Sequence, residues 1–250
     1  MNNIKEPGSN HKGLGSLFNI KTVNISKSFS GTKALENINL ELMAGEIHGM
    51  VGQNGAGKST LGKIIGGYHQ SSEGKLILNN EEIKKWSPKT ALDNGVAMIH
   101  QELALVPLMS VFENIFLGIE KNKFGVLEKQ NLELFYQLEE KIGFGLNPND
   151  IVGNLRIADQ QKVEIMRALA RNAKIIIMDE PTSSLTKDEI NRLHTLMLQL
   201  KSSKYLIIYI SHFLDAILEV CDKVTILRDG KLIRTSAIKN EKRVACYSVS

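Results

Sequence analysis

The pattern of apolar and polar positions divides the chain into short strands and helices that alternate along most of its length. Alternating apolar side chains predict strands over residues 20–29 and 34–42, and residues 46–51 resemble a short buried strand. Shorter runs predict strands over 74–78, 82–83, 96–100, 175–179, 205–211, 223–227 and 231–234. Helices are predicted from residue 60 and over 88–93, 111–117, 132–142, 160–171 and 187–200. This alternation is typical of an α/β fold with a mostly parallel sheet.

Residues 105–170 break the alternation, because they carry helical spacing and no strand pattern. Ser110, followed three residues later by Glu113, forms a capping box at the start of one of these helices. We interpret 105–170 as a helical subdomain inserted between two strands of the core. Residues 1–20 are predicted to be a flexible extension and 239–250 carry no recognisable pattern, which leaves 21–238 as the folded domain.

Composition sets limits on the class of protein. The chain has 250 residues, 42% hydrophobic and 23% charged, and its net charge of +4 is too small to favour nucleic acid as a partner. Cys221 and Cys246 lack metal-ligand or redox spacing. The N-terminus lacks a signal-peptide core, and no apolar run approaches the roughly 18–20 residues that span a bilayer. We expect a cytosolic chain that associates with a membrane only through a partner.

The strongest chemical signal follows the 46–51 strand. The segment fits the phosphate-loop pattern G-x-x-x-x-G-K-[ST] and continues into a helix. Its residues are Gly52, Gln53, Asn54, Gly55, Ala56, Gly57, Lys58, Ser59 and Thr60. The glycines allow backbone N–H groups to wrap a phosphate chain, Lys58 can reach terminal phosphates, and the Ser59 hydroxyl can ligate Mg²⁺. The alternative is a glycine-rich turn before an ordinary helix.

Polar residues also stand at the ends of other predicted strands. They are Gln101, Asp179, Glu180 and His212. In an open α/β sheet the carboxyl ends of parallel strands face the ligand, so we expect Asp179 to serve Mg²⁺, Glu180 to act as general base and His212 to contact a γ-phosphate. Each residue also has an ordinary alternative. Gln101 could be a solvated loop residue, Asp179 and Glu180 could cap a helix, and His212 could be a structural histidine. A separate capping box at Thr186 weakens the second of these.

Phe29 precedes the phosphate loop in the sequence and ends a predicted strand. An aromatic side chain in this place could stack on an adenine ring. A core position is an equal alternative for a lone aromatic in a strand.

These motifs, in this order, resemble those of the ATP-binding cassette (ABC) ATPases from about residue 20 to residue 235. The resemblance implies a P-loop NTPase with a RecA-like core, an antiparallel β subdomain and an inserted α-helical subdomain. It implies that Phe29 stacks on adenine, that residues 52–60 are the Walker A loop and that 175–179 is Walker B. It implies that Gln101 is the Q-loop glutamine and joins Ser59 and Asp179 around Mg²⁺.

The same resemblance gives roles to the remaining motif positions. Glu180 matches the catalytic glutamate, residues 183–186 the D-loop and His212 the switch histidine. ATP and Mg²⁺ are the cofactors that this set of positions implies.

A finer resemblance is to the N-terminal cassette of the tandem-cassette importers of the ribose, galactose and xylose type. Residues 101–103, 109–118 and 160–165 carry it. It implies ATP hydrolysis that drives uptake of a sugar or similar small solute, at the cytoplasmic face of the plasma (inner) membrane. The implied partners are a second ATPase cassette, membrane permease subunits and, indirectly, an extracytoplasmic solute-binding protein.

Three features depart from this family. Its signature is near L-S-G-G-Q, whereas residues 155–159 (the signature segment) are Leu155, Arg156, Ile157, Ala158 and Asp159. Arg156 could replace the serine hydroxyl electrostatically, but Ile157 and Ala158 obstruct close backbone approach to a phosphate and Asp159 adds like charge. We therefore expect poor turnover at the ATP site that this face completes. The D-loop has Thr186 where the family usually has Asp.

The other departure is the end of the sequence, where the family would continue into a linker and a second cassette. We expect a natural half-size protein, a fragment of a tandem protein, or the product of a frameshift near residue 240. Two other functions remain open: a regulatory cassette that binds ATP and hydrolyses little, and a cassette protein that acts on ribosomes or DNA. The small net charge and the absence of long charged insertions oppose the last.

Overall fold

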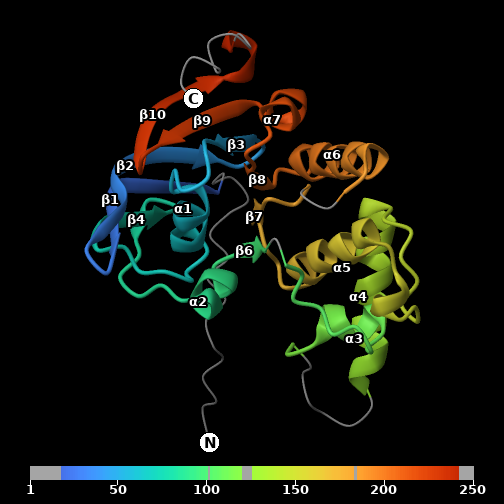
Figure 1. The fold of residues 1–250 in the computed structure, drawn as a ribbon. Helices are drawn as coiled ribbons and strands as arrows, with labels where there is room; N and C mark the ends of the chain where they lie inside the picture. The colour runs from blue at the N-terminus through green and yellow to red at the C-terminus, as the bar shows by residue number, and fades with distance from the viewer. Residues whose placement is uncertain (1–17, 101, 120–125, 183–184, 242–250) are drawn as a thin grey trace, which may run out of the picture.

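Two β-sheets organise the structure, a computed structural model that describes residues 18–100, 102–119, 126–182 and 185–241 (Figure 1). The larger sheet has the strand order β10-β9-β3-β8-β7-β6. Its strands are β3 (Ile47–Val51), β6 (Val96–Ile99), β7 (Ile175–Asp179), β8 (Leu206–Ile210), β9 (Lys223–Arg228) and β10 (Lys231–Ala237). All neighbours pair in parallel except β10, which is antiparallel to β9. The predicted α/β fold with a mostly parallel sheet is confirmed.

The smaller sheet is antiparallel, in the order β2-β1-β4-β5. Its strands are β1 (Asn19–Phe29), β2 (Thr32–Met43), β4 (Glu73–Leu78) and β5 (Glu81–Glu82). Strand β1 begins inside the predicted N-terminal extension, because Asn19 and Ile20 pair with Met43 and Leu42 of β2. The rest of that extension, residues 1–17, lies outside the described residues.

Helix α1 (Lys58–Ile65) packs between the two sheets, where Leu61, Ile64 and Ile65 are buried. The parallel strands supply the other side of this core with every second residue, such as Ile175 and Ile177 of β7. The intervening residues of β7 face a second core, which the remaining helices build. Because β7 and β8 are buried on both faces, they appear in the sequence as nearly continuous apolar runs, whereas the equally buried β3 includes the polar His48.

The predicted helical subdomain covers the second core beside β6 (Figure 1). It contains α3 (Val111–Phe116), α4 (Val126–Ile142), the short 3₁₀ helix η1 (Val152–Asn154) and α5 (Ile157–Ala170). Ser110 and Glu113 form the predicted capping box, and Thr186 with Glu189 forms the other, at the start of α6. The other helices are α2 (Pro88–Asp93), α6 (Lys187–Ser202) and α7 (Leu214–Val220).

The chain after β10 retains structure over its first residues. Ile238–Asn240 forms a 3₁₀ helix, η2, and the Glu241 carboxylate accepts a hydrogen bond from Arg234 at 2.6 Å. The rest of the predicted tail, residues 242–250, lies outside the described residues. Among the helices of the described ranges, none is both long enough and apolar enough to cross a bilayer.

Candidate active site

The phosphate loop connects the carboxyl end of β3 to the first turn of α1, as the sequence predicts. Gly57, immediately before α1, has a φ of +99°, and a Cβ there would lie 2.8 Å from the Ala34 carbonyl oxygen. A Cβ on Gly52 would lie 2.2 Å from the Leu227 carbonyl oxygen. Only glycine fits either position, so the neighbouring strands shape the loop as a backbone cradle at the N-terminus of a helix.

Lys58 is buried at the base of this cradle. Its ammonium donates hydrogen bonds to the carbonyl oxygens of Gly52 at 2.7 Å and Gln53 at 3.2 Å, and lies 4.0 Å from a Glu180 carboxylate oxygen. Burial lowers the pKa of Lys58, and the negative charges of Glu180 and Asp179 oppose that shift. The loop thus holds a cation against its own backbone, where a phosphate would offer it stronger acceptors.

Ser59 and Asp179 meet although they lie far apart in the sequence. The Ser59 hydroxyl donates a 2.8 Å hydrogen bond to Oδ1 of Asp179, which ends β7. A hydroxyl and a carboxylate are the hard oxygen ligands that Mg²⁺ prefers, and Mg²⁺ commonly takes its other ligands from water and phosphate. This pair therefore fits the predicted metal.

Glu180 and His212 also lie together, at the ends of the neighbouring strands β7 and β8. Nδ1 of His212 is 2.8 Å from Oε2 of Glu180. Glu180 has a φ of +51°, a left-handed conformation that is uncommon for residues other than glycine, and its N–H donates to the Ile210 carbonyl at 3.0 Å. Strained backbone of this kind persists where the surroundings fix it, and it is concentrated at functional sites.

The structure therefore brings Lys58, Ser59, Asp179, Glu180 and His212 to one edge of the sheet. The positions of some other predicted site residues are not described by the structure. Gln101 and residues 183–184 of the predicted D-loop lie outside the described residues.

Phe29 ends β1 with 41% of its surface exposed, so it is not a core residue. Its ring packs edge-on against His69 at 5.2 Å, and the Lys27 ammonium lies 4.8 Å from the ring centroid. The exposure of Phe29 is compatible with the predicted stacking on an adenine ring.

The signature segment forms the start of α5. Arg156 occupies the N-cap position, Ile157 is 43% exposed, and Asp159 in the first turn pairs with Lys162 at 2.7 Å. An acidic side chain in the first turn stabilises a helix but competes with any external anion for its positive end. The start of α5 therefore presents Arg156 and Ile157 to solvent, while its first-turn acid is paired within the helix.

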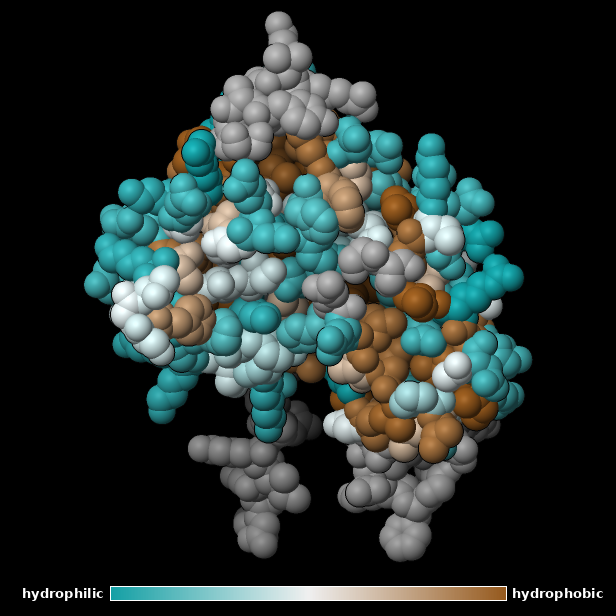
Figure 2. Space-filling model, in the orientation of Figure 1, coloured by the Kyte–Doolittle hydropathy of each residue, from teal (hydrophilic) through white to brown (hydrophobic). Residues whose placement is uncertain are grey.

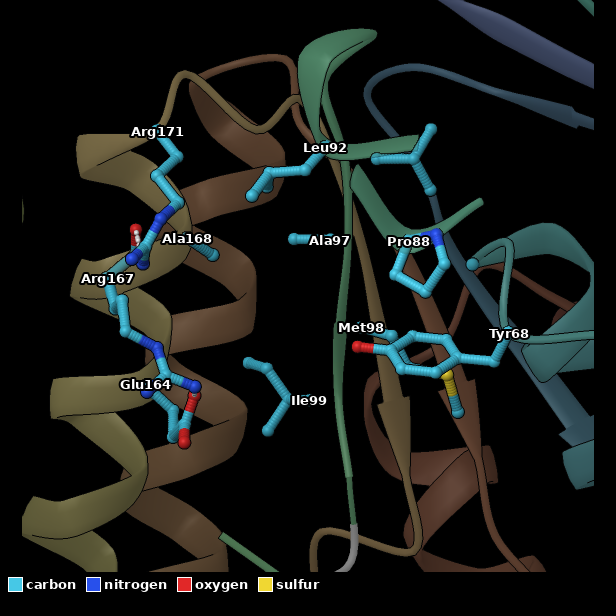
Figure 3. Close-up of a pocket in the computed structure, with 12 residues that line it drawn as sticks. Tyr68, Pro88, Leu92, Ala97, Met98, Ile99, Glu164, Arg167, Ala168 and Arg171 are labelled. Carbon is cyan, nitrogen blue, oxygen red and sulfur yellow. Dashed lines mark hydrogen bonds and ion pairs between the residues drawn. The ribbon is translucent and has the colours of Figure 1, made fainter. Parts of the chain in front are cut away.

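A cavity of about 220 Å³ lies between the core and the helical subdomain. Figure 3 shows β6 in its middle, with Glu164 and Arg167 of α5 on one side and Tyr68 and Pro88 on the other. Glu164 is 5% exposed, and its Oε2 pairs with Arg167 at 2.6 Å. Its Oε1 has no hydrogen-bond partner among the described residues, and burial raises the pKa of this carboxyl while Arg167 opposes the shift.

Sequence reasoning missed Glu164 and also Gln161, a buried residue whose side chain contacts the segment after Asp179. Both belong to a helix whose apolar spacing was clear. A buried polar residue on the core face of such a helix is a signal for function, but burial becomes visible only in the fold.

Comparison with known sequences gives the family. The sequence model of the ABC transporter family matches residues 35–183. The chain is 46% identical over 208 residues to the ribose import ATP-binding protein RbsA of Chromobacterium violaceum, covering 82% of this chain and 41% of that protein. It is 44% identical to the galactose/methyl galactoside import ATP-binding protein MglA of Clostridium tetani, covering 84% of this chain and 43% of that protein. The chain thus spans less than half the length of these relatives.

Solved structures agree on the fold. A nucleotide-free ATP-binding cassette from an ABC transporter superposes with a TM-score of 0.81 at 24% identity, covering 93% of this chain and 96% of that one. A bacterial ABC transporter cassette described as dimeric has a TM-score of 0.75 at 25% identity, covering 89% of this chain and all of that one (100%). The family match and the relatives above 40% identity show that this chain belongs to the ABC transporter family of ATP-binding proteins.

Proposed function

We propose that this chain binds and hydrolyses ATP as one cassette of an importer that takes up a sugar or similar small solute. The observation that carries the proposal is the convergence of the phosphate loop, Asp179, Glu180 and His212 at one sheet edge, with Ser59 bonded to Asp179 and Glu180 to His212. These contacts join residues from separate parts of the sequence in the arrangement that water attack on a γ-phosphate requires.

Each residue has a role that its position supports. The loop N–H groups and Lys58 stabilise negative charge on the phosphates, and Glu180 orients or deprotonates the attacking water. His212 holds the Glu180 carboxylate and is placed to contact a γ-phosphate. Phe29 offers its exposed ring to the adenine.

Ser59, Asp179 and Gln101 would hold Mg²⁺, which, when bound, supplies charge neutralisation for the phosphates. Gln53, Asn54, Gly55, Ala56 and Thr60 complete the nucleotide-binding segment.

The solute class rests on the relatives, which are named for ribose, galactose and methyl galactoside import. Their greater length supports a second cassette as a partner, in the same polypeptide or in another. An importer also needs permease subunits and, outside the membrane, a solute-binding protein. We place the chain at the cytoplasmic face of the membrane, as a peripheral subunit.

The helical subdomain is the proposed contact with the permease. Figure 2 shows an apolar surface over this part of the molecule. The exposed large apolar side chains of residues 105–170, among those the structure describes, are Val106, Leu108, Leu117, Leu132, Tyr136, Ile151 and Ile157. Exposed apolar side chains gathered on one lobe are typical of a protein-binding surface. Cysteine cross-linking to a co-expressed permease from the exposed positions Leu108 and Leu117, on either side of the buried residues 114–116, tests this contact, and failure at both would contradict it.

Steady-state ATP turnover by the purified chain, measured over a range of protein concentrations beside Glu180→Gln, tests the main proposal. We expect MgATP binding in both proteins and a large loss of turnover in the variant, of at least about 100-fold. Turnover that rises more steeply than linearly with concentration indicates that the chain pairs with itself. Failure of the wild-type chain to bind MgATP would overturn the proposal.

A second candidate function is a regulatory cassette that binds ATP with little hydrolysis. The signature segment favours it, because Ile157 and Ala158 stand where the family has glycine and obstruct the backbone contact with a phosphate that the signature supplies. Tight MgATP binding without turnover at any concentration supports this second function.

A further inference from the structure

The segment after β7 carries Glu180 in a conformation that needs support. Glu180 has a positive φ, and the two residues that follow it, Pro181 and Thr182, are buried. On the side of β8, the Glu180 N–H donates to the Ile210 carbonyl at 3.0 Å, and the Tyr209 hydroxyl lies 3.4 Å from the Thr182 hydroxyl. The parallel sheet therefore holds one side of residues 179–182.

The other side is held by the helical subdomain. The side-chain amide of Gln161, on α5, donates a hydrogen bond to the Pro181 carbonyl oxygen. Gln161 is 6% exposed and lies in a crevice between α5 and α6, among Ala158, Ile165 and Leu193. A buried amide has few alternative partners, so this bond fixes residues 179–182 to α5.

Gln161 lies one helical turn after Ile157, the first residue of α5, so the two share a face of the helix. The start of α5 is the signature segment, which in the family faces the nucleotide of the opposing cassette. The signature segment is therefore connected to Pro181, the residue after Glu180, by one turn of α5 and the hydrogen bond from Gln161. A displacement of α5 relative to the sheet must either carry the Pro181 carbonyl with it or break the bond.

We propose that Gln161 is a positioning residue, which ties the orientation of the helical subdomain to the geometry of Glu180 in the chain's own ATP site. This inference rests on the proposed function, because it assigns Glu180 to ATP hydrolysis. On this proposal, a movement of the signature segment affects Glu180 in this chain's own ATP site as well as the ATP site of a partner cassette.

Two variants remove the bond with little change in side-chain volume. Gln161→Met has no donor. Gln161→Glu places a carboxylate against the Pro181 carbonyl at high pH, and a donating O–H there once the introduced carboxyl is protonated. Burial raises the pKa of such a carboxyl toward neutrality. The charged groups that line the same crevice are Lys162 on α5 and Glu189 and Arg192 on α6, and Glu180 itself lies next to Pro181.

The matched control is Gln160→Met. Gln160 is the adjacent residue of the same type, and its amide donates to the Leu155 carbonyl at 3.1 Å, a bond that stays within the helical subdomain. Loss of this amide leaves the contact between α5 and Pro181 in place.

Hydrogen exchange of the Glu180 and Leu185 amides, which donate to Ile210 and Thr182, is the first readout. We expect Gln161→Met to speed exchange at these amides about tenfold, with the β8 amides and Gln160→Met unchanged. The exchange rate of these amides in Gln161→Glu, divided by their rate in Gln161→Met, should fall at least threefold from pH 8 to pH 6. The reason is that the introduced carboxyl becomes protonated and its O–H can again donate to the Pro181 carbonyl. Unchanged exchange in Gln161→Met, a flat ratio, or equal acceleration of β8 would overturn the proposal.

Nucleotide gives the second readout. In the wild-type chain MgATP should slow exchange at Lys58 and at Glu180, whereas in Gln161→Met the effect should persist at Lys58 and be lost at Glu180. If MgATP changes nothing in the wild-type chain, the proposed function fails while the nucleotide-free comparison still decides the role of Gln161. If MgATP protects Glu180 equally in both proteins, the positioning role is wrong.

Discussion

The carboxyl edge of the parallel sheet and the start of α5 are both expected to touch ATP phosphates, and they differ in how well they suit that task. At the sheet edge the Ser59 hydroxyl donates to Asp179 at 2.8 Å, and the Lys58 ammonium lies 4.0 Å from a Glu180 carboxylate oxygen beside the glycine cradle. At the start of α5 Arg156 and Ile157 are both exposed, and Asp159 is paired with Lys162. The sheet edge can bind an anion, whereas the side chains at the start of α5 keep a phosphate from coming close to the helix backbone.

This difference teaches that a cassette can keep its own site while the face it lends to a partner changes. The edge residues are tied to one another through the backbone pairing of β3, β7 and β8, so a change in one disturbs the others. The signature segment is a single helix start, where substitutions affect few neighbours. The predictions that follow act on one region or the other.

Removal of Lys58 should have the largest effect, since it takes the only buried cation from the described part of the cradle. Lys58→Ala should weaken MgATP binding about 30- to 150-fold, which corresponds to the roughly 2–3 kcal/mol of hydrogen bonds to a charged group. Calorimetric titration measures this, with Lys63→Ala in the last turn of the same helix as the control. Near-normal affinity would contradict the assignment of the sheet edge as the nucleotide site.

Loss of the His212 contact should have the next largest effect. His212→Ala removes the partner 2.8 Å from Glu180 and should lower kcat about 30-fold, near 2 kcal/mol, with MgATP affinity kept within a few-fold. His212→Gln retains a donor and should recover part of the rate. A variant that loses affinity and keeps its rate would place His212 in binding alone.

Restoration of the signature segment tests the other region. The triple change Arg156→Ser, Ile157→Gly and Asp159→Gln opens the helix start to a phosphate and should raise turnover at high protein concentration about tenfold, or about 1.4 kcal/mol. Arg156→Ser alone is the control, because it leaves Ile157 and Asp159 in place. Unchanged turnover in the triple variant would show that the signature face does not limit the reaction.

The smallest effect is expected at Glu164, which lies on α5 beyond the signature segment. Burial raises its pKa, so the folded state favours the neutral carboxyl, and the stability that this supplies at low pH is lost as pH rises through the raised pKa. Glu164→Gln should therefore raise Tm relative to wild type at pH 8, by about 2–4 °C for roughly 1 kcal/mol, and leave it unchanged at pH 4.

Glu113→Gln is a control for which we expect the opposite change in Tm at pH 8. The hydrogen bond from the Ser110 backbone N–H lowers the pKa of Glu113, so its contribution is present at neutral pH and lost as pH falls. This variant should lower Tm at pH 8 and converge with wild type in acid. Equal Tm differences for Glu164→Gln at both pH values would contradict the raised pKa.

Much of the fold was predictable because local chemistry and tertiary packing agree. The run 175–179 is apolar because β7 is buried on both faces, and capping boxes at Ser110 and Thr186 fixed the starts of their helices. The phosphate loop was predictable because the glycine requirement is itself local: the φ of +99° at Gly57 demands that residue.

What the sequence determined by itself is therefore the set of elements, their order and the loop that meets a phosphate. It did not reveal that Ser59 bonds to Asp179 across a separation of 120 residues, or that Glu180 adopts a left-handed conformation beside His212. Nor did it show that Gln161 donates a hydrogen bond to the Pro181 carbonyl, or that a buried carboxylate oxygen of Glu164 has no hydrogen-bond partner among the described residues. The tertiary structure decided these, because strand order and helix packing bring distant side chains together and bury them, and neither is written in any local pattern.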